Sequence, residues 1–137
     1  MKKIIFTLLL TGTLFSCSDE FNYYLGRYPQ KWQLVKMKGE LPNSERTGAD
    51  MDWQEFYLLK SDGTFTKQRE EDGIQTEAHG TFTLTNNEIE LVYDTNCLII
   101  GSCSGNQTES LLIKSSVKLV GTWSYCDGPE LEYKRVE

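Results

Sequence analysis

The chain has 137 residues, enough for one domain with its own core but too few for a second. A hydrophobic content of 39% and an aromatic content of 12% exclude a disordered chain. The formal net charge of −6 argues against nucleic acid as a partner, because a phosphate backbone is bound by basic surfaces.

The first sixteen residues have the arrangement of a bacterial signal peptide. Lys2 and Lys3 precede an apolar run that reaches Phe15 and is shorter than the ~20 residues needed to span a bilayer. The stretch Leu14-Phe15-Ser16-Cys17 resembles the lipobox of bacterial lipoproteins. This resemblance implies cleavage after residues 1–16 and several acyl chains on Cys17, palmitate among them, which together anchor stably in a membrane. A general secretory signal with an incidental cysteine is the alternative.

Residues 17–30 are predicted to be a lipidated tether. Ser18-Asp19-Glu20 is similar to the signal that takes some lipoproteins to the outer face of the outer membrane; a solvated polar tether is the alternative. We expect an outer-membrane lipoprotein of the cell envelope, displayed at the surface. Loss of Lys2 and Lys3 with the signal peptide changes the formal net charge from −6 to −8.

The remaining residues, 31–137, are predicted to form an all-β domain. Short runs of alternating apolar and polar residues are separated by turn residues, a pattern typical of antiparallel strands. Eight strands are expected: Lys31–Lys38, Phe56–Lys60, Thr64–Glu70, Ile74–Leu84, Glu88–Asp94, Glu109–Lys114, Lys118–Tyr125 and Glu130–Val136. Any helix is expected to be brief and to lie within residues 39–52.

Eight strands joined mostly by tight turns favour an antiparallel up-and-down barrel, because closure leaves no unpaired edge. Counting along the chain puts the turns 61–63, 85–87 and 115–117 at one end. The longer connections 39–52, 71–73, 95–108 and 126–129 are then at the other end, as in a cup. The tether enters at the end with the short turns, so we expect the bilayer on that side.

The domain resembles the lipocalin-like lipoproteins of Gram-negative bacteria. The residues that carry this resemblance are Trp32-Gln33-Leu34-Val35, the hairpin Ser61-Asp62-Gly63-Thr64-Phe65, Cys126-Asp127-Gly128-Pro129 and Glu132-Tyr133-Lys134-Arg135. The resemblance implies a lipocalin-like barrel that binds a small apolar ligand.

Three cysteines remain after acylation of Cys17, and they suit an oxidising envelope. The barrel places Cys97, Cys103 and Cys126 at the end with the long loops, so we expect one disulfide from Cys126 to either Cys97 or Cys103. A zinc site made of these thiols is disfavoured because the chain has no CxxC pair and no histidine near them.

The sequence offers no catalytic constellation, and we expect neither an enzyme nor a bound cofactor or metal. His79 is the only histidine and falls on the polar face of its strand, where solvent contact is expected. The acidic run Glu70-Glu71-Asp72 lies in a turn without the alternating oxygen ligands of a calcium loop.

Two functions remain open. In the first, the barrel holds a small apolar or amphipathic ligand in a cup. Its lining would come from Trp32, Leu34, Phe65, Ile74, Phe82, Leu91, Tyr93, Trp123 and Tyr133. In the second, side chains fill the barrel and its loops bind a protein, as an inhibitor, immunity factor or accessory subunit would. The large inward aromatics favour filling. In both cases the aromatic residues Trp53 and Tyr125, expected to be exposed beside the loops, are candidates for contact.

Overall fold

The computed structural model describes residues 25–85 and 87–136. Within these ranges the chain forms nine strands and two short 3₁₀ helices. They are β1 (Gln30–Lys38), β2 (Arg46–Thr47), η1 (Gly48–Asp50), β3 (Gln54–Leu59), β4 (Thr64–Glu71), β5 (Ile74–Leu84), β6 (Glu88–Tyr93), β7 (Thr108–Ser115), β8 (Lys118–Gly121), η2 (Trp123–Tyr125) and β9 (Glu130–Arg135).

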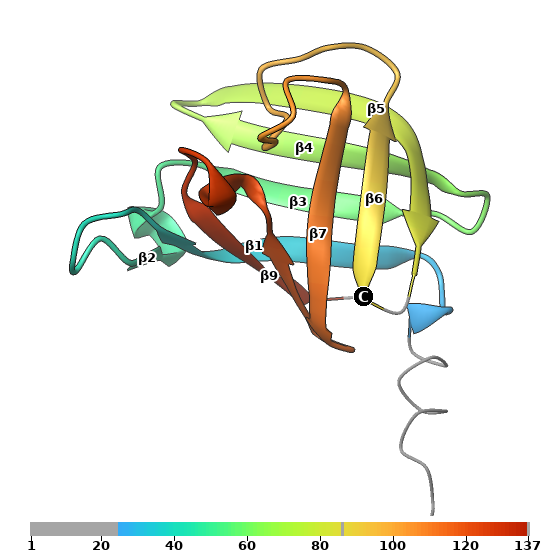
Figure 1. Ribbon diagram of the computed structural model, residues 1–137, viewed down its shortest axis with the longest axis horizontal. Helices are drawn as coiled ribbons and strands as arrows, with labels where there is room; N and C mark the ends of the chain where they lie inside the picture. The colour runs from blue at the N-terminus through green and yellow to red at the C-terminus, as the bar shows by residue number, and fades with distance from the viewer. Residues whose placement is uncertain (1–24, 86, 137) are drawn as a thin grey trace, which may run out of the picture.

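Eight of the strands form a closed antiparallel barrel, which confirms the predicted fold class. Neighbouring strands follow chain order from β3 to β9, and β1 pairs with both β3 and β9 (Figure 1). Trp32 is opposite Tyr57 on one side and Arg135 on the other, so the first strand closes the sheet. The short β2 lies outside this circle and pairs with the second half of β1.

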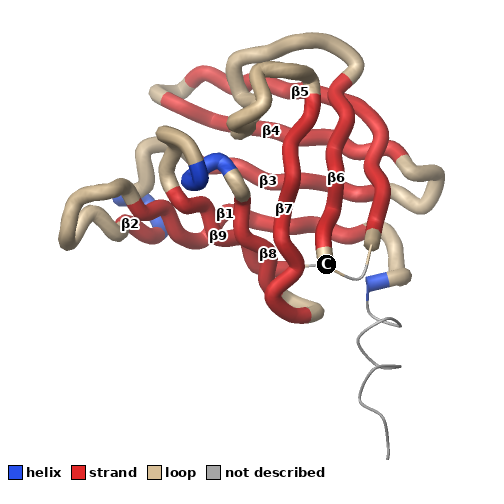
Figure 2. Tube along the Cα trace, in the orientation of Figure 1, coloured by secondary structure: helices blue, strands red, loops and turns tan. Residues whose placement is uncertain are grey.

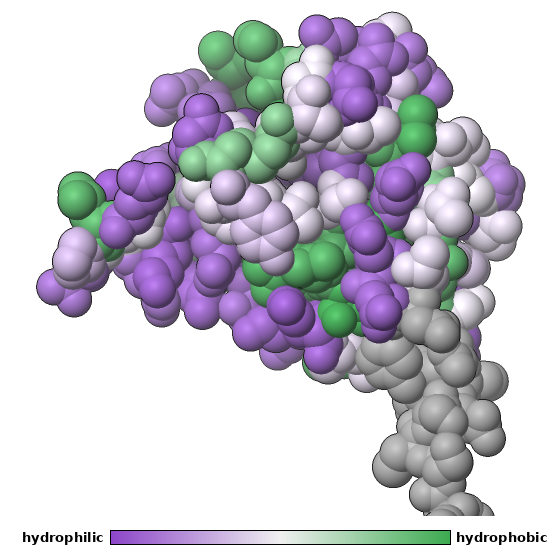
Figure 3. Space-filling view, in the orientation of Figure 1, coloured by the Kyte–Doolittle hydropathy of each residue, from purple (hydrophilic) through white to green (hydrophobic). Residues whose placement is uncertain are grey.

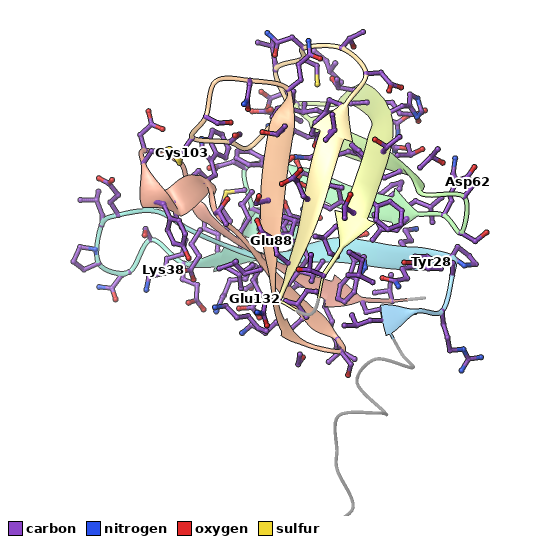
Figure 4. All side chains as sticks on the ribbon, turned by 45° about the vertical axis from the view of Figure 1, so that its right-hand side comes forward. Tyr28, Lys38, Asp62, Glu88, Cys103 and Glu132 are labelled. Atoms are coloured by element: carbon purple, nitrogen blue, oxygen red, sulfur yellow. A yellow bond between two sulfur atoms is a disulfide. The ribbon has the colours of Figure 1, made fainter. Side chains whose placement is uncertain are left out.

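The two ends of the barrel differ in their connections (Figure 2). One end has the short turns 60–63, 85–87 and 116–117, and the chain enters β1 there; we call it the turn-bearing end. The other end has the connections 39–53, 72–73, 94–107 and 122–129, and we call it the loop-bearing end. Figure 4 shows Tyr28 and Asp62 at the first end and Lys38 and Cys103 at the second. The predicted division of the connections is therefore correct.

Alternating residues of the strands meet in the core. Its buried members are Trp32, Leu34, Met37, Met51, Tyr57, Leu59, Phe65, Ala78, Ile89, Leu91, Tyr93, Ile99, Leu111, Leu119, Leu131 and Tyr133. Gly80 leaves room inside this group, because a Cβ there would lie 2.0 Å from the Val92 oxygen and 2.8 Å from the Phe65 ring. The rings of Phe65 and Tyr93, which flank Gly80 across the sheet, meet edge to face at 4.9 Å.

Three local predictions of the fold were wrong. Ile74 was expected to point inward, but its side chain is 68% exposed because β5 begins beyond the packed part of the barrel. The strand expected to end at Tyr125 ends at Gly121. There the Thr122 hydroxyl donates to the Ser110 oxygen, and the chain turns into η2. This short helix lies outside residues 39–52, where any helix was expected.

The predicted signal peptide, Cys17 and most of the predicted tether lie outside the described residues. Within the described part of the chain, no helix is both long and apolar enough to cross a bilayer.

Candidate functional site

Four charged side chains lie inside the barrel toward the loop-bearing end. They are Glu55 on β3, Lys67 and Arg69 on β4, and Glu109 on β7, and we call them the buried charge cluster. Lys67 Nζ lies 3.3 Å from Glu55 Oε1 and 3.1 Å from Glu109 Oε2. Arg69 lies opposite Glu55 in the sheet and donates from Nε to Glu55 Oε2 at 2.6 Å. Two positive and two negative charges thus neutralise each other away from water.

Three buried tyrosines supply further donors to the two glutamates. Tyr57 donates to Glu109 Oε1 at 2.7 Å, Tyr133 donates to Glu55 Oε1 at 2.6 Å, and Tyr93 donates to Glu109 Oε2. Burial, reinforced by the nearby glutamates, raises the pKa of all three hydroxyls well above the ordinary value of 10.0. The tyrosines therefore remain protonated donors at neutral pH.

The cluster also fixes the 94–107 loop to the barrel. Lys67 Nζ donates to the main-chain oxygen of Ile99 at 2.6 Å, and Arg69 Nη2 lies 3.5 Å from the same oxygen. The Ile99 side chain is buried with the core. The middle of this loop is thus held on the barrel by hydrogen bonds from the cluster and by packing of Ile99 in the core.

Chemically, the cluster is a closed network. Each carboxylate oxygen of Glu55 and Glu109 accepts at least one bond from Lys67, Arg69 or a tyrosine. General acid or base chemistry needs a proton that a substrate can reach, whereas these four side chains are at most 7% exposed. The arrangement is suited to holding strands and loop together.

The structure separates the aromatic residues predicted to contact a ligand. Trp32, Phe65, Tyr93 and Tyr133 are packed in the core. The Trp32 indole donates to Gln30 Oε1 at 3.0 Å, so its polar atom is also satisfied inside the barrel. Phe82 is partly buried and its ring centroid lies 5.8 Å from that of Tyr28, on the outer part of the core. Side chains thus occupy the positions expected to line a cup.

The other three predicted aromatics lie at the loop-bearing end. Trp53 is half-buried rather than exposed, because its ring lies 4.1 Å from the Arg69 guanidinium and 6.5 Å from the Trp123 ring. Gly128 packs directly on Trp123, where a Cβ would lie 2.2 Å from the ring. Tyr125, in contrast, is 74% exposed. The Trp53 indole nitrogen is buried and has no hydrogen-bond acceptor among the described residues.

A disulfide joins two connections of the loop-bearing end. It links Cys103 to Cys126, with the Cα atoms 5.7 Å apart, and so selects one of the two predicted pairings. Cys97 is a free, half-buried thiol that packs against the core. The disulfide ties the 94–107 loop to the segment after β8, while the buried charge cluster holds the same loop from below.

Apolar side chains project from the loop-bearing end. The most exposed large hydrophobic residues among those described are Leu98, Leu41, Tyr125 and Ile74, at 98%, 75%, 74% and 68%. Ile74 and Leu98 border one hollow of about 240 Å³. Figure 3 shows apolar areas at this end within a mostly hydrophilic surface, and a further area over β7 and β8.

A second hollow, of about 510 Å³, lies between η1, the start of β3 and the end of β4. Met51, Trp53 and Gln54 line it, together with Glu70. A third hollow is on the outside of β7 and β8, between Leu112, Val120 and Tyr125. The hollows are therefore on the surface, around the rim and the outer wall.

His79 faces solvent, as predicted. Its Nε2 lies 2.9 Å from Glu77 Oε1 and its Nδ1 lies 3.2 Å from Thr66 Oγ1, all on the outer side of the sheet. In residues 25–136, apart from residue 86, no group of three or more His, Cys, Asp and Glu side chains is placed to hold a metal ion.

The buried charge cluster was missed by the sequence interpretation, although a signal for half of it exists. Phe65, Lys67 and Arg69 fall on one face of a strand, so an inward Phe65 places both cations inside. In the same way Glu109 shares a face with Leu111. What no single strand reveals is that β3, β4 and β7 carry charges that neutralise each other.

Comparisons with known proteins give information on the fold and none on the function. No family model matches the chain, and no curated protein matches it. A solved structure of an uncharacterized protein from Bacteroides eggerthii DSM 20697 is similar, with a TM-score of 0.50 and 16% sequence identity. The match covers 80% of this chain and 99% of that chain, which makes it a likeness of fold alone.

Proposed function

We propose that this protein is a lipid-anchored envelope protein whose filled barrel presents the loop-bearing end to a protein partner. The observation that carries the proposal is the packing of the interior. Trp32, Phe65 and Tyr133 occupy the expected cup, and the buried charge cluster takes up the space toward the loops. A barrel of eight strands is just wide enough either to be filled or to hold one small ligand, and filling supports a scaffold.

The surface of the loop-bearing end supports the same function. Recognition is usually carried by loops on a rigid scaffold, and here the 94–107 loop is fixed by the Cys103–Cys126 disulfide and by Lys67. Leu98 and Ile74 project next to each other around a hollow, and Tyr125 is exposed on η2. Exposed tyrosine and aliphatic side chains on fixed loops are suited to the centre of a protein interface.

Loss of binding on substitution at this end would test the proposal. A Leu98→Ser, Tyr125→Ala variant should lose a partner that chemical crosslinking captures from envelope fractions, since both side chains are exposed and neither supports the fold. The matched control is Asp62→Ala, Asn87→Ala at the turn-bearing end, where both residues are exposed. If the control loses the partner and the loop variant retains it, the interface is at the turn-bearing end and the proposal is wrong.

One observation supports a second candidate, a small amphipathic ligand at the loop-bearing end. Trp53 lines the hollow beside η1, and its indole N–H has no acceptor among the described residues. A buried donor without a partner costs about 1–3 kcal/mol, so a ligand oxygen could gain from meeting it.

Substitution of Trp53 by phenylalanine distinguishes this candidate. Trp53→Phe removes the N–H group and keeps a ring over Arg69. If a small molecule occupies the hollow, mass spectrometry of solvent extracts should detect it with the wild type and not with the variant. Equal extracts from the two proteins, or none from either, would leave the protein partner as the function.

A further inference from the structure

The charges of the barrel are separated between its two ends. At the loop-bearing end, the connections and adjoining strand ends carry ten exposed acidic residues. The exposed basic residues there are Lys38 and Arg46. At the turn-bearing end the balance is reversed. The basic residues there are Arg27, Lys31, Lys60, Lys114, Lys118, Lys134 and Arg135, and the acidic ones are Asp62 and Glu88. Lys118 also forms an ion pair with Glu132, in the middle of β9. Both counts are for the described part of residues 25–136.

The basic residues form a continuous arc because neighbouring strands carry them. Lys118 is paired with Lys134 across β8 and β9, and Ser115, next to Lys114, is paired with Lys118. Val136 donates its N–H to the Lys31 oxygen, which continues the arc onto β1. Lys60 lies in the turn after β3, the next strand round the barrel.

Two exposed apolar side chains lie within this arc. Val117 is 51% exposed in the turn between β7 and β8, and Val136 is 53% exposed just after β9. They belong together, because the Val117 oxygen accepts a bond from the N–H of Arg135. Apolar side chains surrounded by lysine and arginine are the composition of surfaces that lie in a membrane interface.

The chain outside the described residues leads to the same end. It enters β1 at the turn-bearing end, and only seven residues separate Leu25 from Cys17. Even fully extended, this stretch spans only about 30 Å, so an anchor at Cys17 keeps the arc close to the lipid. Attraction between exposed charges acts over about 8 Å at physiological salt. A tether of this length allows the basic arc to come within that distance of the headgroups.

We propose that the turn-bearing end binds directly to an anionic lipid headgroup surface, with the Lys60–Lys114–Lys134 side of the barrel against the phosphates. The contact rests on charge and on Val117 and Val136, and it adds to the proposed anchor at Cys17. The acidic loop-bearing end is then repelled by the same surface and points away from it.

The test uses residues 25–137 without the anchor, because all strands and the core lie within the described part of this segment. Binding is measured by sedimentation with vesicles of phosphatidylethanolamine and phosphatidylglycerol, and with vesicles of phosphatidylcholine alone. Each lysine at such a surface contributes about fivefold in affinity, so Lys60→Gln, Lys114→Gln, Lys134→Gln should lose roughly 100-fold. The single variant Lys60→Gln should lose about fivefold, and the matched Lys38→Gln at the other end should lose nothing.

Three results would overturn the proposal. They are equal binding to both kinds of vesicle, equal loss with Lys38→Gln and Lys60→Gln, and no binding to anionic vesicles at low salt. None of them bears on acylation of Cys17 or on a partner at the loops, because the protein used lacks the anchor and is alone. Circular dichroism of each variant confirms that the barrel is intact.

Discussion

Lys67 is fully buried, with its ammonium group held by Glu55, Glu109 and the Ile99 carbonyl. Removal of one partner from a buried ion network leaves uncompensated charge, which costs about 3–5 kcal/mol. We therefore expect Lys67→Met to lower the free energy of unfolding by about that amount in urea titrations. The control Lys60→Met, in an exposed turn, should stay within about 0.5 kcal/mol of the wild type.

A change below about 1 kcal/mol for Lys67→Met would mean that the network adds little to stability. In that case the 94–107 loop would owe its position to the disulfide and to Ile99, and not to the charges beneath it.

Glu132 gives a prediction for acid. Burial acts to raise its pKa, but hydrogen bonds from Lys118 and Lys36 outweigh burial and hold the pKa below the ordinary 4.5. A carboxyl group with a lowered folded-state pKa stabilises the protein above its unfolded-state pKa, and this stabilisation is lost as the pH falls through the folded value. The advantage of the wild type over Glu132→Gln should thus shrink from about pH 4.5 downward.

Urea titrations across this pH range test the prediction, with exposed Glu90→Gln as the control. A gap between wild type and Glu132→Gln that widens in acid would show that the sign is wrong.

At the same scale, the sequence predicted which aromatic residues point inward but missed the charged ones. Tyr93 and Tyr133 were placed correctly because their strands alternate cleanly. Lys67 and Arg69 follow the same alternation after Phe65, yet charged residues are rarely buried unless paired. Their partners on β3 and β7 are distant in sequence, so only the barrel brings them together.

Among the elements, β5 depends on one residue without a side chain. A Cβ at Gly80 would lie 2.0 Å from a backbone oxygen of β6, which cannot move aside as a side chain can. We expect Gly80→Ala to destabilise the barrel by about 1–3 kcal/mol or more in thermal or urea unfolding. Gly121→Ala is the matched control, since its Cβ would meet Leu131 at an ordinary 3.8 Å. Equal effects at the two sites would contradict the close packing around Gly80.

The disulfide acts on two connections at once. Replacement of Cys103 and Cys126 by serine should cost about 2–5 kcal/mol, because the bridge restricts the unfolded chain across a separation of 23 residues. Cys97→Ser leaves the bridge intact and serves as the control. Unfolding in urea with and without a reductant gives the comparison. A wild type that is as stable in reductant as in its absence would argue against this role.

The strands were well predicted because each has its own alternation and ends in turn residues such as Asp62-Gly63. The differences lie where tertiary contacts decide. β2 has two residues and exists through its pairing with Lys36 and Met37 of β1. η2 replaces the end of a predicted strand because Thr122 bonds back to Ser110 and Trp123 packs on Gly128.

At the scale of the whole molecule, attachment to the membrane is predicted to depend on Cys17, which lies outside the described residues. In high salt, which screens the proposed contact between the turn-bearing end and the headgroups, Cys17→Ser should release the protein from membranes without unfolding it, since the barrel begins at β1. Metabolic labelling with a radioactive fatty acid should mark the wild type and not the variant. Equal labelling of both would reject the lipoprotein prediction.

Surface display is tested separately. The acidic residues Asp19 and Glu20 are expected to direct export to the outer face of the membrane. Replacing Asp19 and Glu20 with alanine should protect the protein from protease added outside intact cells while leaving it acylated. Unchanged digestion of the variant would reduce these acids to part of a tether.

The pairing of β1 with β9 has a consequence for the folding of the protein during its synthesis. Synthesis proceeds from the N-terminus, so β1 is made well before β9, and the sheet keeps two open edges until β9 is added. During that interval the open edges of β1 and β8 can pair with other chains. A chaperone that covers β1 and β8 until β9 is made would shorten this exposure. Ribosomes that stop before Glu130 would release a chain that cannot close.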